Sequence, residues 1–397
     1  MKNAKERWSM NDAPKRIISI SDSKITEVAD LGRDNPKVIK LWIGEGDLKT
    51  PEVISRAATK ALEQGYTRYT FSRGIPALHE ALQRYHKRHW GVNISTDRFS
   101  VTCGGMGAVM QAFQAILEPD EEVIVPCPVW PNVWETVRIV GGKVKYVLLD
   151  FDETKCFSLD LEKIASAITP KTRAIYINSP HNPTGCVLSL EEMEYLLKLT
   201  RQHGLWLVSD EVYNHFTYSD KITPSFLQLS EPNDRLIVTN TFSKNWCMTG
   251  WRLGWMIYPQ GMQGVFDNLG QFNTTSVATF LQYGAIAALD EGDEFIQQFV
   301  QRSKIGRDII CSSLETVSRV RIVRPEATFY AMFSVDGMTD GLESAKQILR
   351  EANVGVAPGA GFGLGAESYL RVCFGVDHKI LKDAGNRLTE FFAKTLM

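Results

Sequence analysis

The chain has 397 residues, charged side chains at 23% of its positions and a formal net charge of −2. Because a single hydrophobic core rarely grows beyond about 250–300 residues, this length predicts more than one domain. The near balance of charge argues against a nucleic acid or an anionic membrane as a partner, since both select basic surfaces.

Short apolar segments alternate with longer amphipathic segments through the middle of the chain. The predicted strands lie at 122–126, 143–149, 173–178, 205–209 and 236–239, and the predicted helices at 107–117, 159–168 and 190–203. Strand and helix in repeated alternation are typical of an α/β fold, here a three-layer unit with a mainly parallel sheet covered on both faces. In such sheets the ligand binds beyond the carboxyl ends of the strands.

The pattern changes after about residue 290. A long helix is expected at 290–317, strands at 319–323, 328–333 and 369–374, and further helices at 342–352 and at the carboxyl terminus. This order predicts a smaller α+β domain, and the segment before residue 48 is expected to pack with it. The predicted division is a large domain at 48–289 and a small domain formed by 1–47 together with 290–397.

The segment Thr241-Phe-Ser-Lys-Asn-Trp-Cys-Met-Thr-Gly-Trp-Arg252 carries the strongest chemical signal. Lys244 lies among small and apolar neighbours, where an amine loses its proton more readily and becomes a nucleophile. Arg252 can donate two parallel hydrogen bonds to a phosphate, and hydroxyls lie just upstream. A lysine for an aldehyde and an arginine for a phosphate together describe pyridoxal phosphate, although an ordinary basic loop is the alternative.

Polar turns follow two of the predicted strands. Asn182 lies in a proline-rich turn after 173–178 and is either a turn residue or a fixed donor for a phenolate oxygen. Asp210 follows 205–209 and is either a helix cap or the carboxylate that keeps a pyridine nitrogen protonated. On composition alone Glu211 could take that part, and Tyr213 could reach the same phenolate oxygen as Asn182.

Four further features have both a structural and a functional interpretation. The glycines of 103–108 precede a helix whose first amides would attract phosphate, although glycine-rich turns are common. Trp130 is either a core residue or a ring that stacks on a flat cofactor. Arg371, inside an apolar strand pattern, forms either a buried salt bridge or a clamp for a substrate carboxylate. His86 and His89 lie on a basic helix and are expected to be solvated.

In combination these motifs resemble the class I and II aminotransferases, fold type I of the pyridoxal-phosphate enzymes, over about residues 41–374. The motifs occur in the order of that family: Gly44-Glu-Gly-Asp47, Tyr69 with Gly74-Ile-Pro76, Gly104-Gly105, Asn182-Pro-Thr-Gly185, Asp210-Glu-Val-Tyr213, Ser243-Lys244, Met248-Thr-Gly-Trp-Arg252 and Arg371. The resemblance implies an aminotransferase that moves an amino group from an L-amino acid to a 2-oxo acid by a ping-pong reaction, through a Schiff base of pyridoxal 5'-phosphate on Lys244. The alternative is a pyridoxal-phosphate-dependent carbon–sulfur β-lyase of the same fold.

The resemblance also implies a role for each residue. Lys244 would hold the cofactor and move the substrate's α-proton, Asp210 would face the pyridine nitrogen, and Trp130 would stack on the ring. The phenolate oxygen would be held by Asn182 and Tyr213. The cofactor's phosphate would be bound by the amides of Met106 and Gly107, by the hydroxyls of Thr241 and Ser243, and by Arg252. The substrate's α-carboxylate would be bound by Arg371, with Asn182 and the backbone of Gly44 nearby.

In such enzymes Tyr69 reaches the phosphate of the neighbouring subunit, so the resemblance implies a homodimer. Two positions depart from the family pattern: Gly46 replaces a common proline, which predicts a looser lid, and Ala327 replaces a common glycine. Both leave the shape of the substrate pocket open.

The remaining features concern the cell compartment and metals. The amino terminus is charged and leads into no apolar signal core, and no run approaches the roughly 18 apolar residues of a membrane span. The seven cysteines include no C-x-x-C pair, so neither a disulfide framework nor a zinc site is predicted. We therefore expect a cytoplasmic protein without a metal.

Overall fold

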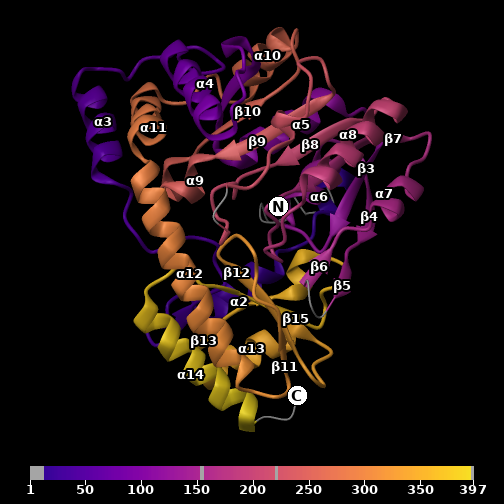
Figure 1. Cartoon of the computed structure of the whole chain (residues 1–397), viewed down its shortest axis with the longest axis vertical. Helices are drawn as coiled ribbons and strands as arrows, with labels where there is room; N and C mark the ends of the chain where they lie inside the picture. Colours follow the sequence, from indigo (N-terminus) through magenta and orange to yellow (C-terminus); the bar gives the residue numbers. More distant parts are fainter. Residues whose placement is uncertain (1–12, 153–155, 220–221, 395–397) are drawn as a thin grey trace, which may run out of the picture.

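The computed structural model describes residues 13–152, 156–219 and 222–394. Across these ranges no helix is long and apolar enough to cross a membrane. The described part of the chain forms two units, and one long helix runs from the larger into the smaller, as Figure 1 shows.

The larger unit is built on a seven-stranded sheet with the order β2-β10-β9-β8-β7-β3-β4. Its strands are β2 (Phe99–Cys103), β3 (Glu122–Cys127), β4 (Lys143–Leu148), β7 (Thr172–Asn178), β8 (Trp206–Asp210), β9 (Leu236–Thr241) and β10 (Leu253–Ile257). The neighbours from β4 to β9 pair in parallel, whereas β10 pairs antiparallel with both β9 and β2. The sheet is therefore mainly parallel, as predicted.

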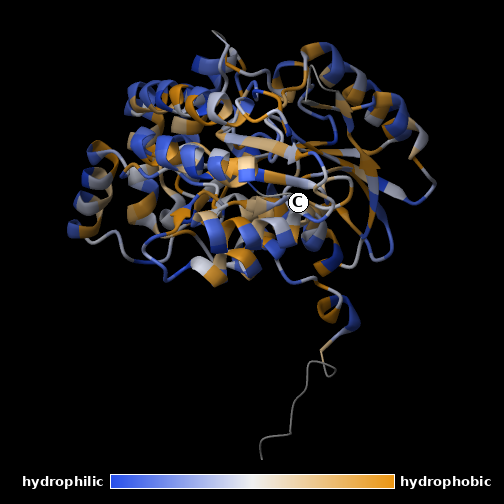
Figure 2. Ribbon diagram, turned by 90° about the horizontal axis from the view of Figure 1, so that it is seen from below, coloured by the Kyte–Doolittle hydropathy of each residue, from blue (hydrophilic) through white to orange (hydrophobic). Residues whose placement is uncertain are grey.

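Helices cover both faces of this sheet because successive side chains of a strand point to opposite faces. In β7, Ile175 and Ile177 pack in the core beneath α4 (Pro76–Trp90), α7 (Leu161–Ser166), α8 (Leu190–His203) and α11 (Thr279–Glu291). On the other face Ala174 and Tyr176 pack with α5 (Gly104–Ile116), α6 (Asn132–Ile139) and α10 (Gln263–Asn273). Figure 2 shows hydrophobic residues along the strands and both kinds of residue on the helices. These faces give the predicted three layers.

The smaller unit is an α+β arrangement around a four-stranded antiparallel sheet with the order β11-β12-β15-β14. These strands are β11 (Val320–Ile322), β12 (Tyr330–Val335), β14 (Ala357–Pro358) and β15 (Tyr369–Cys373). They share a core with α2 (Lys24–Gly32), α12 (Asp293–Glu315), α13 (Gly341–Ala352) and α14 (His378–Lys394). In addition β1 (Ile39–Lys40) pairs in parallel with β13 (Val354–Gly355), so an early segment joins the late ones.

The other regular elements are short or peripheral. They are α1 (Lys15–Ile18), α3 (Glu52–Glu63), β5 (Asp150–Asp152), β6 (Cys156–Ser158), α9 (Phe242–Asn245) and short 3-10 turns, among them Thr249–Trp251. Local signals set several helix ends: Ser189 and Glu192 form a capping box at the start of α8, and Gly204 ends that helix in the left-handed conformation.

Three expectations from the sequence needed correction. The five predicted strands are present, but β2 and β10 were not predicted; β10 contains Gly254, and glycine is depleted in strands. The helix expected from residue 107 begins at Gly104, so the glycines belong to its first turn. His86 is buried rather than solvated; it accepts a hydrogen bond from the Trp255 indole, and burial lowers its pKa to about 3. His89 is half-buried beside Asp293.

The contact between β13 and the segment after β1 generates the first prediction. A Cβ at Gly355 would lie 1.7 Å from Cζ3 of Trp42, a fully buried ring that cannot shift without disturbing its neighbours. We expect Gly355→Ala to destabilise the protein by about 1–3 kcal/mol through overpacking, measured by urea unfolding. Gly264→Ala is the control: no atom lies within 4 Å of its Cβ, and in helix α10 alanine should stabilise by about 0.5–1 kcal/mol. Equal stability of the two variants would contradict this account.

Candidate active site

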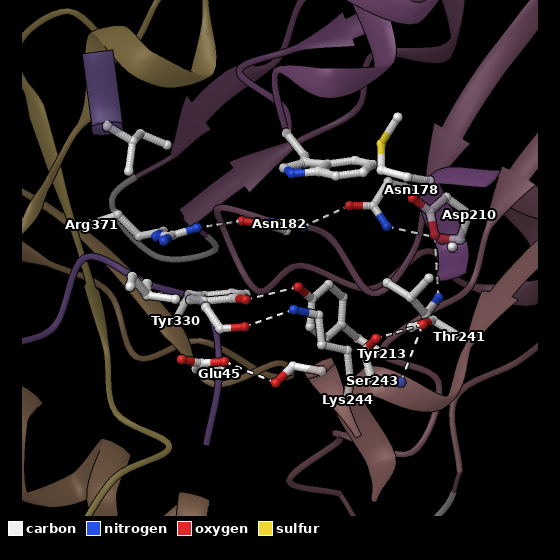
Figure 3. Close-up of a pocket in the computed structure, with 18 of the residues that line it drawn as sticks. Glu45, Asn178, Asn182, Asp210, Tyr213, Thr241, Ser243, Lys244, Tyr330 and Arg371 are labelled. Atoms are coloured by element: carbon white, nitrogen blue, oxygen red, sulfur yellow. Dashed lines mark hydrogen bonds between the residues drawn. The ribbon is translucent and has the colours of Figure 1, made fainter. Parts of the chain in front are cut away.

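A cavity of about 370 Å³ lies at the carboxyl ends of β7, β8 and β9, between the two units (Figure 3). Of the residues that the sequence analysis predicts for the site, those that line it are Gly44, Met106, Trp130, Asn182, Asp210, Tyr213, Thr241, Ser243, Lys244, Arg252 and Arg371. Gly107 and Tyr69 do not line it. The parallel strands bring these side chains together because their carboxyl ends meet at one edge of the sheet.

Lys244 lies in the short helix α9, directly after the end of β9. Its Nζ donates a hydrogen bond of 2.7 Å to the carbonyl oxygen of Gly44, in the segment that follows β1. Burial lowers the pKa of the Lys244 amine to about 8. The neighbouring guanidinium groups of Arg371 and Arg252 act in the same direction. A substantial fraction of this amine is therefore neutral, and nucleophilic, slightly above neutral pH.

Asp210 ends β8, and its carboxylate is buried in the cavity wall. Oδ2 accepts a hydrogen bond of 2.8 Å from the hydroxyl of Tyr176 in β7. Burial raises the pKa of Asp210 to about 6, against the opposing effect of this hydrogen bond. Glu211 faces away from the cavity, where its Oε1 accepts hydrogen bonds from the Ser209 hydroxyl and the Phe226 amide. Of the two acids, only Asp210 is placed to meet a ligand.

Hydroxyls and a guanidinium gather where β9 ends and α5 begins. Thr241 caps α9 with its Oγ1, which also donates to Oγ of Ser243 at 3.0 Å. The guanidinium of Arg252 lies over the start of α5, where a Cβ at Gly104 would be only 2.3 Å from its Nη2. Glycine at this position therefore allows the arginine to approach the helix terminus. A helix N-terminus, two hydroxyls and an arginine form a site suited to a dianion.

The residues at the start of α5 differ in their placement. Gly105 and Met106 line the cavity, whereas Gly107 follows in the same turn and does not. The interpretation of Gly107 as a phosphate ligand therefore stays a prediction. Trp130 lines the cavity in the loop after β3, and its amide donates to the Asn182 carbonyl at 3.1 Å.

Arg371 projects from β15 of the smaller unit and is only 4% exposed. Its Nη1 donates to Oδ1 of Asn182 at 2.9 Å, and its Nη2 donates to the carbonyl oxygen of Trp42 at 2.6 Å. The guanidinium lies between the rings of Tyr330 and Phe362, with 4.2 and 4.7 Å from Cζ to the ring centroids. Among the described residues Nε has no hydrogen-bond partner, and the partners of Nη1 and Nη2 are an amide oxygen and a carbonyl oxygen rather than a carboxylate. The buried salt bridge considered above is therefore not formed.

Tyr213 joins the two units at the floor of the cavity. Its hydroxyl lies 2.8 Å from that of Tyr330, and its ring centroid lies 5.8 Å from Nζ of Lys244. Gly44 makes a comparably close approach, because a Cβ there would lie 2.0 Å from the Tyr330 hydroxyl. Gly46 is similarly packed, since a Cβ would lie 2.4 Å from Cζ of Phe299 in α12. Gly46 is therefore closely packed against α12, and the looser lid expected from the absence of proline stays a prediction.

Several lining residues were not predicted for the site. They are Ile25, Trp42, Ile43, Glu45, Gly105, Asn178, Val212, Thr249 and Tyr330. Asn178 orients the edge of the sheet: its Nδ2 donates to the Asp210 carbonyl and its Oδ1 accepts from the Asn182 amide. Asn178 is the last residue of a predicted parallel strand, and this position could have indicated a residue of the site. Ile25 comes from α2, far away in the sequence, and nothing local marks it.

The residues of the cavity fit pyridoxal 5'-phosphate. A buried amine with a lowered pKa suits its aldehyde, the buried carboxylate of Asp210 suits its ring nitrogen, and the site of Thr241, Ser243 and Arg252 suits its phosphate. Arg371 keeps an unpartnered Nε beside the same cavity, which leaves capacity for a further carboxylate.

Comparisons with known proteins agree with this chemistry. Residues 36–388 match the family described as aminotransferase class I and II. The probable aspartate aminotransferase of Methanocaldococcus jannaschii is 33% identical, over 95% of this chain and 99% of that protein. The solved aspartate aminotransferase of Thermotoga maritima superposes with a TM-score of 0.89 at 32% identity, covering 96% of this chain and 100% of that one. The aromatic aminotransferase of Pyrococcus horikoshii gives 0.86 at 31% identity, covering 93% and 99%.

These relatives all carry the name aminotransferase, which favours amino-group transfer over the carbon–sulfur β-lyase. The fold, the cavity and the match over most of the chain lead to the same conclusion. The chain belongs to the class I and II aminotransferases, and it is a pyridoxal 5'-phosphate-dependent enzyme that transfers an amino group from an amino acid to a 2-oxo acid.

Proposed function

We propose that the amino donor is an L-amino acid with a neutral, apolar side chain, and that Lys244 is the residue that binds the cofactor and handles the α-proton. The observation that carries this proposal is the distribution of charge in the cavity. Each cation in the described lining has a role in the proposed reaction, and the lining also contains the apolar side chains of Ile25, Trp42, Ile43, Met106 and Val212.

The cofactor supplies an aldehyde that joins amines and a ring that takes up negative charge from the α-carbon. Lys244 would provide the amine that joins this aldehyde, and the same amine would take the substrate's α-proton and return it. Burial of this side chain supports both roles, since it lowers the pKa to about 8 and leaves neutral amine available. Its 2.7 Å hydrogen bond to Gly44 shows that Nζ can reach the opposite wall of the cavity.

The other residues hold the cofactor in place. The phosphate would be bound by Thr241, Ser243, Arg252 and the amide of Met106, which line the cavity, and by the amide of Gly107 in the first turns of α5. Asp210 would face the ring nitrogen and keep it protonated. Asn182 and Tyr213 would hold the phenolate oxygen, and Trp130 would stack on the ring; all three line the same cavity.

Arg371 binds the α-carboxylate of the substrate, with Asn182 and the backbone of Gly44 nearby. A bidentate arginine–carboxylate pair fixes the orientation of the substrate as well as its affinity. The rings of Tyr330 and Phe362 hold the guanidinium plane, so little side-chain freedom is left to lose on binding.

The side chain of the substrate meets an apolar wall made by Ile25, Trp42, Ile43 and Met106. Over the described residues, the cations in the lining are Lys244, Arg252 and Arg371, which all have the roles above. The lining also carries the carboxylate of Glu45, whose Oε2 accepts a hydrogen bond from Thr249, and its negative charge would repel a second substrate carboxylate. Burying an unpaired carboxylate is costly, so acidic substrates are disfavoured.

A homodimer is part of the proposal. The side chain of Tyr69 is 90% exposed, and the aromatic rings of Phe71 and Phe272 are also exposed. Exposed aromatic side chains support a protein–protein interface. In this dimer Tyr69 reaches the phosphate in the neighbouring active site.

The proposal includes the two domains and the cell compartment. The pairing of β1 with β13 and the shared core of α2 with α13 support one small domain formed by 1–47 and 290–397, against a large domain at 48–289. The cytoplasm is the proposed compartment, since amino acids and 2-oxo acids of metabolism are its substrates.

The substrate proposal predicts the result of a half-reaction assay. Purified holoenzyme is mixed with single amino acids, and the visible absorption of the cofactor is followed. We expect second-order rate constants for phenylalanine, leucine or methionine at least about tenfold above those for aspartate and glutamate, which corresponds to about 1.4 kcal/mol. Lys244→Ala should react with none of them, whereas Lys60→Ala on the exposed face of α3 should behave like the wild type.

A preference for aspartate would contradict the proposed substrate class. Lys24 lines a neighbouring cavity together with Met106. Loss of that preference in Lys24→Met would then identify Lys24 as the cation for the distal carboxylate.

The dimer proposal predicts complementation between two inactive variants. Lys244→Ala lacks the amine, and Tyr69→Ala lacks the side chain that reaches the neighbouring site. In a mixed dimer one site carries both changes and the other carries neither. After denaturation and refolding of an equal mixture, we expect about a quarter of wild-type activity, from random pairing in a symmetric dimer. Activity no higher than that of the parent variants would contradict the shared site, and a monomer in analytical ultracentrifugation would contradict the dimer.

The burial of Asp210 predicts that its ionised carboxylate, which is proposed to serve the reaction, lowers the free energy of unfolding. Its pKa rises from 3.8 to about 6 on folding, so ionisation disfavours the folded state. In the cofactor-free protein, Asp210→Asn should raise the free energy of unfolding by about 3 kcal/mol above pH 6. The gain should shrink as the pH falls from 6 towards 4, where the wild-type carboxyl is neutral in both states.

Urea unfolding of the cofactor-free proteins at pH 4.5, 6 and 8 tests this. Asp340→Asn serves as the control, because asparagine also caps a helix and this position is exposed at the start of α13. A gain in stability that is independent of pH, or shared by the control, would contradict the assignment.

A further inference from the structure

The hydroxyl of Tyr176 is placed directly behind Asp210. Both residues lie on the same face of the sheet, and in the parallel register Tyr176 is opposite Val208, two residues before Asp210. The tyrosine therefore reaches its partner diagonally across neighbouring strands. It is fully buried, and its hydroxyl donates a hydrogen bond of 2.8 Å to Oδ2 of Asp210.

The direction of this hydrogen bond is fixed by chemistry. Burial, and secondly the charge of Asp210, raise the pKa of the Tyr176 phenol well above its ordinary value. A raised pKa favours the protonated phenol, so the phenol is the donor and the carboxylate is the acceptor. A buried hydroxyl needs such a partner, whereas phenylalanine would fill the same space without one.

The other contacts of the Asp210 carboxylate are weaker. Oδ1 accepts from the Val212 amide at 3.4 Å. Lys244 from α9 favours the ionised form by its charge, and Glu211, the adjacent acid, is held away by Ser209 and Phe226. The phenol is therefore the shortest hydrogen bond that the protein gives this carboxylate, and it occupies one of the two oxygens.

We propose that Tyr176 is a positioning residue for the reaction, which holds Asp210 ionised and turned so that Oδ1 faces the ring nitrogen of the cofactor. This inference rests on the proposed role of Asp210. With Oδ2 occupied by the phenol, the carboxylate cannot rotate freely within the cavity wall. The phenol also offsets part of the cost of burying the charge, since a hydrogen bond to an ionised group is stronger than one between neutral groups.

If the Tyr176 hydroxyl only stabilised the core, its removal would have different effects. A structural hydroxyl would affect unfolding and nothing else. A positioning hydroxyl changes the protonation of the cofactor ring and the affinity for the cofactor, and its effect disappears when Asp210 can no longer ionise. A double-mutant cycle separates the two.

The experiment uses Tyr176→Phe, which removes one buried oxygen and keeps the ring. We expect the dissociation constant of the cofactor to rise about tenfold, because one hydrogen bond to a charged group is lost. The holoenzyme loaded with cofactor labelled at its ring nitrogen should show a ¹⁵N shift moved towards the unprotonated form. In kinetics kcat should fall by about the same factor, with KM for the amino acid little changed.

Two variants make the outcome decisive. Tyr258→Phe removes another buried hydroxyl on the same face of the sheet, where it contacts Arg73 and backbone carbonyls; it should leave the ¹⁵N shift and cofactor affinity unchanged. In the Asp210→Asn background, Tyr176→Phe should have no further effect on either readout.

The results distinguish this inference from the function on which it rests. A wild-type ¹⁵N shift and affinity in Tyr176→Phe, or equal effects with and without the Asp210 carboxylate, would overturn the positioning role. If Asp210→Asn itself left the ring protonated and the affinity unchanged, the proposed role of Asp210 would fail first, and the role of Tyr176 with it.

Discussion

The parallel pairing of β7, β8 and β9 is the constraint on which the site depends. Its register places Asn178 beside Asp210 and Asp210 beside Thr239, so the strands end at one level. The last residues of β9 then carry the chain to Thr241 and into the short helix with Lys244. A slip of one residue in any pair would move these side chains to the other face of the sheet. Backbone hydrogen bonds thus fix the geometry of the chemistry.

The second general feature is that the cavity holds charges without their ordinary partners. Arg371 has aromatic rings and carbonyl or amide oxygens around it, and Asp210 has a phenol. Lys244 donates to a backbone carbonyl. Each arrangement costs free energy in the empty protein, and the packed cores of both units offset that cost. The complementary charges come with the cofactor and the substrate, so binding energy is concentrated where the reaction occurs.

The sequence alone predicts much of this structure, for physical reasons that differ from one residue to another. The alternating pattern predicts the parallel strands, and the Lys244 segment predicts the chemistry, because both signals are local. The strand β10 was not predicted because Gly254 lies within it, and glycine is depleted in strands. His86 was misjudged because its charged neighbours on α4 conceal a buried face. The contacts of Tyr176 and Ile25 depend on register and on distant packing, which no local pattern contains.

The cavity wall has two separate supports. The residues proposed for the chemistry are on the edge of the large sheet, on α9 and on β15, where their positions are fixed by ladders of backbone hydrogen bonds. Much of the apolar wall comes instead from α2 and from the segment after β1, which pack against that frame and are not part of the large sheet. Replacements at Ile25 or Ile43 alter the shape of the cavity while the catalytic frame is preserved. In such a fold, substitutions in α2 or in the segment after β1 can change which substrates bind, while the residues that carry out the reaction stay the same.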